Sequence, residues 1–499
     1  MIKSILIANR GEIAIRIART ASRMGIKTYG IRTKKEPNAV YLQKVDQIVD
    51  FPETDGKVPE FLDIPNLVKL AVDNNIESMH PGYGYLSENA DFAKACRDAG
   101  VIFIGPSPEV IKAMGDKIIA KEIAHRSNVP MVGGTLGGIP NAEEALKEAN
   151  RIGYPVIIKA ATGGGGRGMR VCYKESEVKT NYELCTAEAT TAFNDPTVFI
   201  EKYVVNPKHI EFQIVADKYG NVVHLGEREC SIQRKHQKLM EEAPSPALDD
   251  ELRAKMAKAA VDLAKEAHYE SLGTVEFLLD DNRNFYFMEM NTRIQVEHPV
   301  TEMITGLNLV ELQLLIASGE KLPVTQDDIH LKGWAIECRI NAEDVQAGFT
   351  PSIGIIRNLR LPSDNNIRID SGVRIGTEIT PFFDSMIAKL IVHGKTRLDA
   401  IELTLKSLEH FHVNGVKTTI PFDKMVLHNE VFRKGDFNTS FIETELKENL
   451  VYKEEHEELI AALLAVSQYN HDTDFAQDNA ENAEQAMDPW VLQKRIRHL

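Results

Sequence analysis

The feature that most constrains this chain is the stretch GTVEFLLDDNRNFYFMEMNTRIQVEH, which occupies residues 273–298. Apolar and polar residues alternate on both sides of a polar loop at 281–284, and this alternation predicts two strands. A four-residue loop between two such strands is typical of a hairpin, here with Asp280 paired to Phe285. We therefore expect a strand pair whose register is set by this loop.

The predicted register places Glu276 directly opposite Glu289, among Phe and Leu residues. Two carboxylates that face each other on one sheet repel, so the arrangement favours a cation between them. Asn291 shares the face of Glu289 and can add an amide oxygen. Oxygen ligands of this kind, together with substrate phosphates, are typical of a magnesium–nucleotide site. The alternative is an exposed hairpin whose acidic side chains are solvated.

A second group of polar residues follows this hairpin. Arg293, Gln295 and Glu297 lie on one face by the same alternation. A cation, an amide and a carboxylate in a row suit a small oxyanion together with a base. A structural ladder of salt bridges would have the same composition.

Composition excludes several classes of protein. The chain has 499 residues, enough for about two to four domains, and a formal net charge of −15. This acidity, without a basic stripe studded with aromatic residues, argues against nucleic-acid binding. The N-terminus enters a folded pattern without a signal peptide, and no apolar run approaches about 18 residues, so we expect no membrane span. Five scattered cysteines without metal or disulfide spacing indicate a reducing, cytoplasmic location.

The N-terminal pattern is a strand at 2–8, a turn at 9–12 followed by a helix, and a second strand at 27–32. This βαβ order is typical of nucleotide-binding α/β domains. The turn lacks GxGxxG, so it does not predict a dinucleotide site. A loop at 80–89 is rich in glycine and aromatic residues and can approach a ligand closely.

A strand at 155–159 ends in Lys159 and leads into the glycine-rich run ATGGGGRGM at 161–169. Backbone N–H groups of such a run can fold over phosphates. Because a further strand follows at 169–173, we expect a mobile lid between two strands. The run is not a P-loop, since no GK[ST] opens a helix. A flexible linker is the alternative.

Three further segments suit a nucleotide pocket. Lys117 lies at a predicted helix start and is a candidate phosphate contact, with an ordinary surface lysine as the alternative. An apolar strand carries Glu201 toward the expected position of an adenine amino group. The segment ECSIQRKHQK brings together Gln233, His236 and Lys238, although a plain basic loop has the same composition.

Several sequence runs occur in the order typical of one enzyme family: IANRGEIAIRI, HPGYGYLSENADFA, FIGPSPEVIKAMGDK, GGGGRGMRV, HIEFQIVAD, ECSIQRKHQKLMEEAP, FMEMNTRIQVEHPVTE, ECRINAED and FDSMIAKLI. With these runs, which cover roughly residues 1–445, the chain resembles biotin carboxylase, the ATP-grasp component of biotin-dependent carboxylases. ECSIQR and MNTRIQVEH are highly specific together, whereas the glycine run alone is not.

The resemblance implies a multidomain fold of α/β and α+β character. It predicts an N-terminal Rossmann-like domain at 1–114 and a central ATP-grasp domain at 115–332, with its lid at about 131–203. A C-terminal mixed α/β domain would occupy 333–446. The remaining segment, 447–499, is polar and acidic before a basic end, and we expect an extension that is partly disordered alone.

The resemblance also implies roles for individual residues. Those expected to contact ATP are Lys117, Lys159, Gly165, Gly166, Glu201, Lys202, Tyr203, Val204, His209, Gln233, His236 and Leu278. Those expected to hold two Mg²⁺ or Mn²⁺ ions are Glu276, Glu289 and Asn291. Those expected to bind bicarbonate are Lys238, Arg293, Gln295 and Val296, with Glu297 as general base. Those expected near biotin are Arg339, against the ureido oxygen, and Tyr83 and Asp384.

The sequence departs from the family pattern at 33–45 and at Thr162, where a glycine is frequent. It contains no Met-Lys-Met biotinyl motif and no carboxyltransferase region. We therefore expect biotin to arrive on a separate carrier protein, and we expect the further partners to include a carboxyltransferase subunit. The extension at 447–499 is a candidate dock, and members of the family are commonly homodimers.

Two other functions compete with this interpretation. Another ATP-grasp ligase, which joins a carboxylate to an amine, would share the lid, the lysines and the metal-binding acids, but it does not require QRKHQK and RIQVE together. An inactive regulatory subunit would be expected to lack Glu276, Glu289, Lys238, Glu297 or Arg339, and all five are present. The sequence leaves the final acceptor open among acetyl-CoA, propionyl-CoA, another acyl-CoA and pyruvate.

Overall fold

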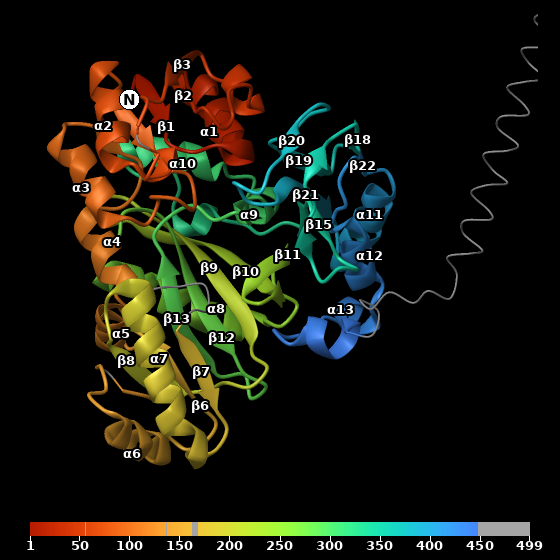
Figure 1. Ribbon diagram of the computed structural model, residues 1–499. Helices are drawn as coiled ribbons and strands as arrows, with labels where there is room; N and C mark the ends of the chain where they lie inside the picture. Colours follow the sequence, from red (N-terminus) through yellow and green to blue (C-terminus); the bar gives the residue numbers. More distant parts are fainter. Residues whose placement is uncertain (55, 136, 162–167, 448–499) are drawn as a thin grey trace, which may run out of the picture. The chain divides into compact units, whose positions relative to one another are not determined.

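The computed structural model describes residues 1–54, 56–135, 137–161 and 168–447 (Figure 1). The central part of the predicted lid, with Thr162, Gly165 and Gly166, lies outside the described residues, and so does the extension from residue 448 onward. Residues Met1–Lys447 form one structural unit.

Five parallel strands form the N-terminal sheet in the order β3-β2-β1-β4-β5. The strands are β1 Ser4–Ile7, β2 Lys27–Arg32, β3 Gln47–Asp50, β4 Ser78–His80 and β5 Ile102–Phe103. The helices of this region are α1 Gly11–Arg23, α2 Ile64–Asp73, α3 Ala90–Asp98 and α4 Pro108–Gly115. The predicted βαβ start is confirmed, because β1 and β2 pair in parallel and α1 connects them. Ile13 and Ile17 of α1 share one buried cluster with Ile5 of β1.

The order of this sheet reverses between β1 and β4, so the loops after these two strands lie side by side at the carboxyl edge. Asn9, just after β1, donates hydrogen bonds from Nδ2 to the backbone oxygens of Pro81 and Tyr83, each at 2.8 Å. His80 Nδ1 accepts from the backbone N–H of Gly82 at 2.9 Å. These bonds fix the loop that carries Tyr83.

A small antiparallel sheet in the order β7-β6-β8 lies within the segment 131–203 that was predicted as the lid. Its strands are β6 Val156–Ala160, β7 Met169–Cys172 and β8 Val198–Lys202. The helices near it are α5 Lys117–Arg126, α6 Ala142–Ile152 and α7 Val178–Phe193. α6 and α7 pack on this sheet through a shared apolar cluster (Figure 1). The glycine-rich run therefore joins two paired strands, β6 and β7, as predicted.

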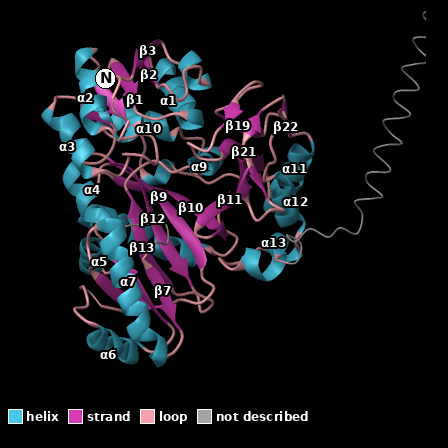
Figure 2. Cartoon of the chain, in the orientation of Figure 1, coloured by secondary structure: helices cyan, strands magenta, loops and turns pink. Residues whose placement is uncertain are grey.

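The largest sheet has eight strands in the order β13-β12-β9-β10-β11-β14-β21-β19, and it lies at the centre of the described unit (Figure 2). Its strands are β9 Lys208–Ala216, β10 Val222–Arg234, β11 Gln237–Ala243, β12 Ser271–Leu279, β13 Phe285–Asn291, β14 Trp334–Asn341, β19 Ile367–Ser371 and β21 Met386–Gly394. Its central helices are α8 Asp250–Glu266, α9 His298–Thr305 and α10 Leu309–Ala317. Because β11 pairs with β14, the sheet continues across the predicted domain boundary near residue 332.

The β12–β13 hairpin confirms the key pairing, but its loop differs from the prediction. Glu276 is paired with Glu289, whereas Phe285 is paired with Leu279 instead of Asp280. Between Phe277 and Glu276 the register shifts, because β13 contains one extra residue there. From Glu276 to Thr274 the pairing is therefore the predicted one. Alternation alone could not predict this bulge, because a bulge leaves the pattern of each strand nearly unchanged.

The rest of the described chain consists of short strands and helices around the end of this sheet. The strand pairs are β15 Glu343–Asp344 with β16 Thr350–Pro351, β17 Gly354–Ile355 with β20 Glu378–Ile379, and β18 Asn358–Arg360 with β22 His412–Asn414. The helices are α11 Arg397–Glu409, α12 Ile420–His428 and α13 Glu430–Lys434. The multidomain α/β and α+β fold predicted from the sequence is confirmed.

Within the described residues, no single helix has the length and apolar composition needed to cross a membrane. The pair α9 and α10 meets that test only as two helices with a 96° bend between them.

Burial of Glu229 predicts a pH-dependent stability. Burial raises the pKa of this carboxyl from 4.5 to about 7, although the hydroxyls of Ser231 and Ser245 donate to it. The folded state then holds a proton that the unfolded chain releases above about pH 4.5, so the free energy of unfolding falls as the pH rises toward 7. In Glu229→Gln this loss is removed, so its stability relative to the wild type should rise by about 2 kcal/mol between pH 5.5 and 8.

Urea unfolding at the two pH values measures this difference. Glu251→Gln, at an exposed glutamate on α8, is the matched control and should show no such change. An equal stability difference for Glu229→Gln at both pH values would contradict the assignment.

Candidate active site

The site is organised around the ammonium group of Lys238 on β11. Its Nζ atom donates to Glu211 Oε2 at 2.5 Å, to Glu276 Oε1 at 3.0 Å and to Glu297 Oε1 at 2.7 Å. These carboxylates come from β9, from β12 and from the residue that precedes α9. Burial alone would lower the pKa of Lys238, but the three carboxylates raise it well above its ordinary value. Lys238 is therefore a fixed cation that uses all three of its donors.

Glu297 has a second cationic partner on its other oxygen. Arg339 Nη2, from β14, donates to Glu297 Oε2 at 3.0 Å and forms an ion pair with Glu241 Oε1 at 2.5 Å. Burial alone would raise the pKa of Glu297, but Lys238 and Arg339 together hold it well below its ordinary value. Glu297 is therefore ionised and able to accept a proton.

Arg228 on β10 belongs to the same hydrogen-bond network. Its side chain is fully buried, and each of its five N–H donors has a partner. The partners are Glu211 Oε1 at 2.5 Å, Gln213 Oε1 at 2.8 Å, Thr301 Oγ1 at 3.0 Å, Thr274 Oγ1 at 3.1 Å and Gln295 Oε1 at 3.0 Å. Glu211 thus lies between two cations, Arg228 and Lys238.

The contact with Arg228 sets the orientation of the Gln295 amide. A guanidinium only donates, so the amide oxygen of Gln295 must face Arg228. Its amide nitrogen is then directed at Glu276 Oε1, to which it donates at 3.0 Å. Because Glu276 is held by Lys238 as well, its pKa lies well below the ordinary value despite burial.

The predicted metal-binding residues lie together at the β12–β13 pair. Asn291 Nδ2 donates to Glu276 Oε1 at 2.8 Å, and its Oδ1 accepts from Arg293 Nη2 at 3.0 Å. The amide oxygen that was predicted as a ligand is therefore bound to Arg293 in this structure. Arg293 also donates to Glu88 Oε2 at 2.9 Å.

Glu289 differs from its neighbours. Within the described residues, no hydrogen bond or ion pair joins it to another side chain, and burial together with the facing Glu276 raises its pKa. A carboxylate pair with one buried and one half-buried member, of which the second forms no ion pair within the described residues, fits an external cation. Two other groups also bring ligand atoms together, His209 with Glu211 and Glu276, and Glu211 with Cys230 and Glu297. Lys238 contacts Glu211, Glu276 and Glu297 in these groups. Glu289 has no such ion pair within the described residues, so it is the carboxylate of this region best able to take up a cation, with Glu276 opposite it.

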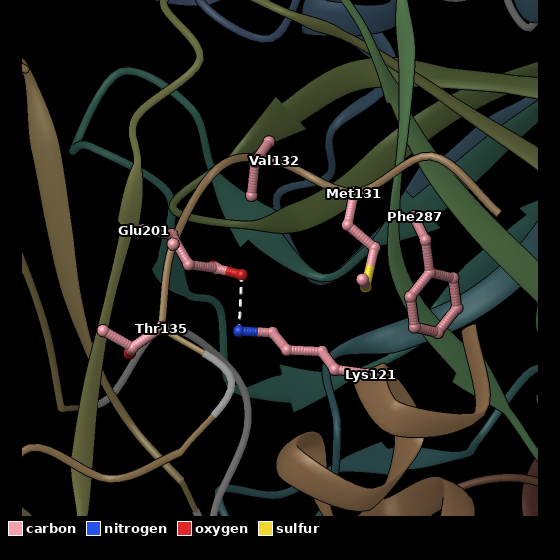
Figure 3. A pocket seen from close by; sticks show the side chains of 7 residues that line it. Lys121, Met131, Val132, Thr135, Glu201 and Phe287 are labelled. Carbon is pink, nitrogen blue, oxygen red and sulfur yellow. Dashed lines mark ion pairs between the residues drawn. The ribbon is translucent and has the colours of Figure 1, made fainter. Parts of the chain in front are cut away.

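Glu201, on β8 at the end of the predicted lid segment, lies among lysines. Lys159 and Lys121 approach its carboxylate at 2.8 Å and 2.6 Å, and Figure 3 shows the Lys121 contact. Although burial acts in the opposite direction, the two lysines hold the pKa of Glu201 at about 2. In this structure the carboxylate forms these two ion pairs, and its contact with an adenine amino group stays a prediction. Lys117 is close enough for the charge of Glu289 to affect its pKa, which burial lowers.

Lys121 and Glu201 also line a small pocket with Met131, Val132, Gly134, Thr135 and Phe287 (Figure 3). None of these residues contacts Lys238. The pocket therefore lies outside the Lys238 network.

The other residues predicted to contact ATP are spread over several strands and turns. His209 Nε2 lies 2.9 Å from Glu276 Oε2, and Gln233 Nε2 lies 3.5 Å from His209 Nδ1. His236 is exposed in the turn between β10 and β11, where it and Lys235 have positive φ angles. Lys202 donates to the backbone oxygens of Gly153 and Tyr154, at 3.0 and 2.8 Å. The half-buried side chains are Tyr203, Val204 and Leu278.

Tyr83 is half-buried, and its hydroxyl donates to Glu12 Oε1 at 2.5 Å. Burial and Glu12 raise its pKa well above the ordinary value, and the charges of Arg339 and Asp384 also act on it. Asp384 is exposed and accepts from the backbone N–H of Met386 at 2.8 Å. Arg339 and Asp384 are therefore electrostatic neighbours of Tyr83, and the contact of all three with biotin stays a prediction.

Three family models match the chain in order. They are "Biotin carboxylase, N-terminal domain" at 1–111, "Carbamoyl-phosphate synthase L chain, ATP binding domain" at 116–325 and "Biotin carboxylase C-terminal domain" at 337–444. Biotin carboxylase 1 of Bacillus subtilis is 49% identical over 445 residues, which are 89% of this chain and 99% of that protein. The chain belongs to the biotin carboxylase family.

Other relatives support the same family assignment. The 2-oxoglutarate carboxylase small subunit of Hydrogenobacter thermophilus is 47% identical over 89% of this chain and 93% of its own length. The biotin carboxylase domain dimer of 2-oxoglutarate carboxylase from the same organism, solved with MgADP, ADP and bicarbonate, superposes with a TM-score of 0.87. It is 47% identical, with coverage of 91% of this chain and 100% of that one. The chain is accordingly an ATP-dependent ligase of the biotin carboxylase type.

Sequence reasoning assigned no role to three cations of the site, Arg228, Lys121 and Lys389. Arg228 directly precedes the run ECSIQR, but its partners come from β9, β12 and α9, far away in sequence. Alternation along β10 places it on one face of the strand without indicating what lies opposite. Only the pairing of β9 with both β10 and β12 brings its partners together.

We expect Arg228→Lys to lower kcat/KM for bicarbonate by roughly 10- to 100-fold, the effect of one lost hydrogen bond to a charged group. A lysine retains the charge beside Glu211 but cannot supply five donors in one plane. The Gln295 amide is then free to turn. Steady-state ATP hydrolysis as a function of bicarbonate measures the effect.

Thr301→Val is the matched control, because it removes one partner of Arg228 that does not touch Gln295. Its kcat/KM for bicarbonate should change by less than about 3-fold. A folded Arg228→Lys protein with the wild-type KM and kcat would contradict the positioning role.

Proposed function

We propose that this chain carries out the first half-reaction of a biotin-dependent carboxylase, in which biotin on a separate carrier protein is carboxylated by bicarbonate and ATP. The observation that carries this proposal is the pair of cations on Glu297. Lys238 and Arg339 each contact a different oxygen of that carboxylate, at 2.7 and 3.0 Å. One base thus lies between an anion-binding lysine and the arginine assigned to biotin.

Bicarbonate becomes a useful nucleophile when a base removes its proton. In this proposal Glu297 is that base, and Lys238, Arg293, Gln295 and Val296 hold the anion. The cations keep the pKa of Glu297 low while no anion is bound, and a bound anion that draws their N–H groups away raises it. Glu297 then becomes basic enough to accept the proton only when its substrate is present.

The deprotonated bicarbonate oxygen attacks the γ-phosphorus of ATP, and ADP leaves with the electrons of the broken P–O bond. In our proposal Lys117, Lys159 and His209 neutralise the phosphates. The carboxyphosphate formed hydrolyses readily, so water must be excluded from the site. That exclusion is the role proposed for the lid, whose Gly165 and Gly166 lie outside the described residues.

Divalent metal fits the pair Glu276 and Glu289, because Glu289 has a raised pKa and lacks a cationic partner within the described chain. Asn291 joins them if its amide turns away from Arg293. Two Mg²⁺ or Mn²⁺ ions bound there would neutralise charge on the phosphates during transfer. The remaining predicted ATP contacts, from Glu201 through Val204 with Gln233, His236 and Leu278, stay predictions.

Carboxyphosphate breaks down to CO₂ and phosphate, and the phosphate takes the N1 proton of biotin. Arg339 then stabilises the enolate-like ureido oxygen while N1 attacks CO₂. Tyr83 and Asp384 would lie beside the biotin ring. The electrostatic proximity of Tyr83, Asp384 and Arg339 supports this grouping.

The proposal extends to domains and partners. We assign domains to 1–114, 115–332 and 333–446, which the family matches support, and the 447–499 extension is a candidate dock. The proposed partners are a carrier protein, a second copy of this chain and a carboxyltransferase subunit. Relatives named as subunits of pyruvate and 2-oxoglutarate carboxylases support a multisubunit assembly. A cytoplasmic location fits the five buried free cysteines.

We expect ATP hydrolysis by the purified full chain to require bicarbonate and to rise when free biotin is added. Glu297→Gln should lower kcat by at least about 100-fold, the usual effect of losing a general base.

Arg339→Ala should abolish biotin carboxylation, which is measured with ¹⁴C-bicarbonate. Either variant with wild-type carboxylation would refute its assignment, and hydrolysis indifferent to bicarbonate and biotin would favour another ATP-grasp ligase.

A further inference from the structure

One buried lysine outside the Lys238 network joins two parts of the site. Lys389 on β21 is fully buried, and its Nζ atom donates to the backbone oxygen of Val296 at 2.8 Å and contacts Glu12 Oε1 at 2.9 Å. The same Glu12 oxygen accepts from the Tyr83 hydroxyl at 2.5 Å. We call the pair Lys389 and Glu12 the Lys389–Glu12 bridge.

This bridge connects three segments that are distant in sequence. Glu12 lies in the first turn of α1, at the carboxyl edge of the N-terminal sheet. Val296 lies between β13 and α9, directly between Gln295 and Glu297. Lys389 reaches both from the far end of the eight-stranded sheet. The bridge therefore links the bicarbonate segment to the loop that carries Tyr83.

Lys389 remains charged in this environment. Burial alone would lower its pKa, but the carboxylates of Glu12, Glu337 and Asp370 raise it above the ordinary value. Removing a charge from water is costly, and a buried pair is often replaceable by apolar residues without loss of stability. A charged lysine at this position is therefore better explained by the groups that its N–H donors hold than by packing.

We propose that the Lys389–Glu12 bridge is a positioning device that couples the biotin subsite to the bicarbonate segment. This inference rests on the proposed function, because it takes Tyr83 as a biotin contact and Val296 as a bicarbonate contact. Neither Lys389 nor Glu12 needs to touch a substrate. Each acts through the group that it holds.

The coupling follows from a shared acceptor. Tyr83 and Lys389 both contact Glu12 Oε1, so a shift of the Tyr83 hydroxyl changes how Glu12 holds Lys389. Lys389 in turn holds the Val296 carbonyl, and thereby the segment that carries Gln295. Biotin that orders Tyr83 thus tightens the bicarbonate segment, and bicarbonate must strengthen biotin binding by the same factor.

Bicarbonate-dependent ATP hydrolysis, measured with the full chain over a grid of bicarbonate and free biotin concentrations, tests this coupling. In the wild type, saturating biotin should lower the KM for bicarbonate by about 5-fold or more, within the usual range of coupling. In Lys389→Met the KM for bicarbonate should no longer depend on biotin. Lys395→Met, at an exposed lysine just beyond β21, is the control and should keep the full dependence.

A second pair of variants keeps the test decisive where Lys389→Met does not fold. Glu12→Gln retains an oxygen that can accept from Tyr83 and Lys389, so it should retain the coupling. Glu12→Ala removes that oxygen and should lose it. If Glu12 served packing alone, both variants could change the melting temperature and kcat. The dependence of the bicarbonate KM on biotin would then be the same in Glu12→Gln and Glu12→Ala.

The outcomes separate the two claims. A wild-type rate that does not respond to biotin would contradict the proposed function itself. A rate that responds to biotin, with a bicarbonate KM that biotin leaves unchanged, would overturn the coupling while the function stands. The coupling is also overturned if Glu12→Ala and Lys389→Met both show the wild-type shift in KM.

Discussion

The arrangement of the site depends on one ammonium group surrounded by three carboxylates. Glu211, Glu276 and Glu297 all lie within 3.0 Å of Lys238 Nζ and are nearly inaccessible to solvent. Without that cation their charges would repel one another at a point where β9 and β12 are paired. The lysine thus makes it possible for strands carrying opposed acids to lie side by side, and it leaves Glu297 ionised.

Such a network is poor evidence for stability, because removing charges from water costs about as much as their attraction returns. What the network does is hold its charged side chains in fixed positions before substrates bind. Arg228 and Lys238 neutralise Glu211, Lys238 and Arg339 neutralise Glu297, and Lys121 and Lys159 neutralise Glu201. Among the described residues Glu289 has no ion pair of this kind, and in our proposal a divalent ion bound with the nucleotide balances its charge. The same groups then meet charge that develops during transfer with little reorganisation.

Much of this could be predicted from local pattern. The pairing of Glu276 with Glu289 was predicted from alternation and the loop register, and it is correct because the bulge offsets the one-residue difference at the loop. The βαβ start followed from apolar runs. The pairing at the hairpin loop was wrong by one residue, because a bulge has no signature in alternation. The ion pairs of Glu201 were not predicted. The pattern of an apolar strand does not show that Lys121, from a separate helix, lies beside this carboxylate. The roles of Arg228 and Lys389 were missed for the same reason, since each acts across strands that are far apart in the chain.

The central claim is that this charge network activates bicarbonate to attack the γ-phosphate of ATP. Transfer of oxygen-18 from labelled bicarbonate to inorganic phosphate tests it most directly, read by mass spectrometry early in turnover, before bicarbonate exchanges its label with water. The account predicts one labelled oxygen in each phosphate, because the attacking oxygen stays on phosphorus when carboxyphosphate loses CO₂. Phosphate whose new oxygen comes from water alone would contradict the account.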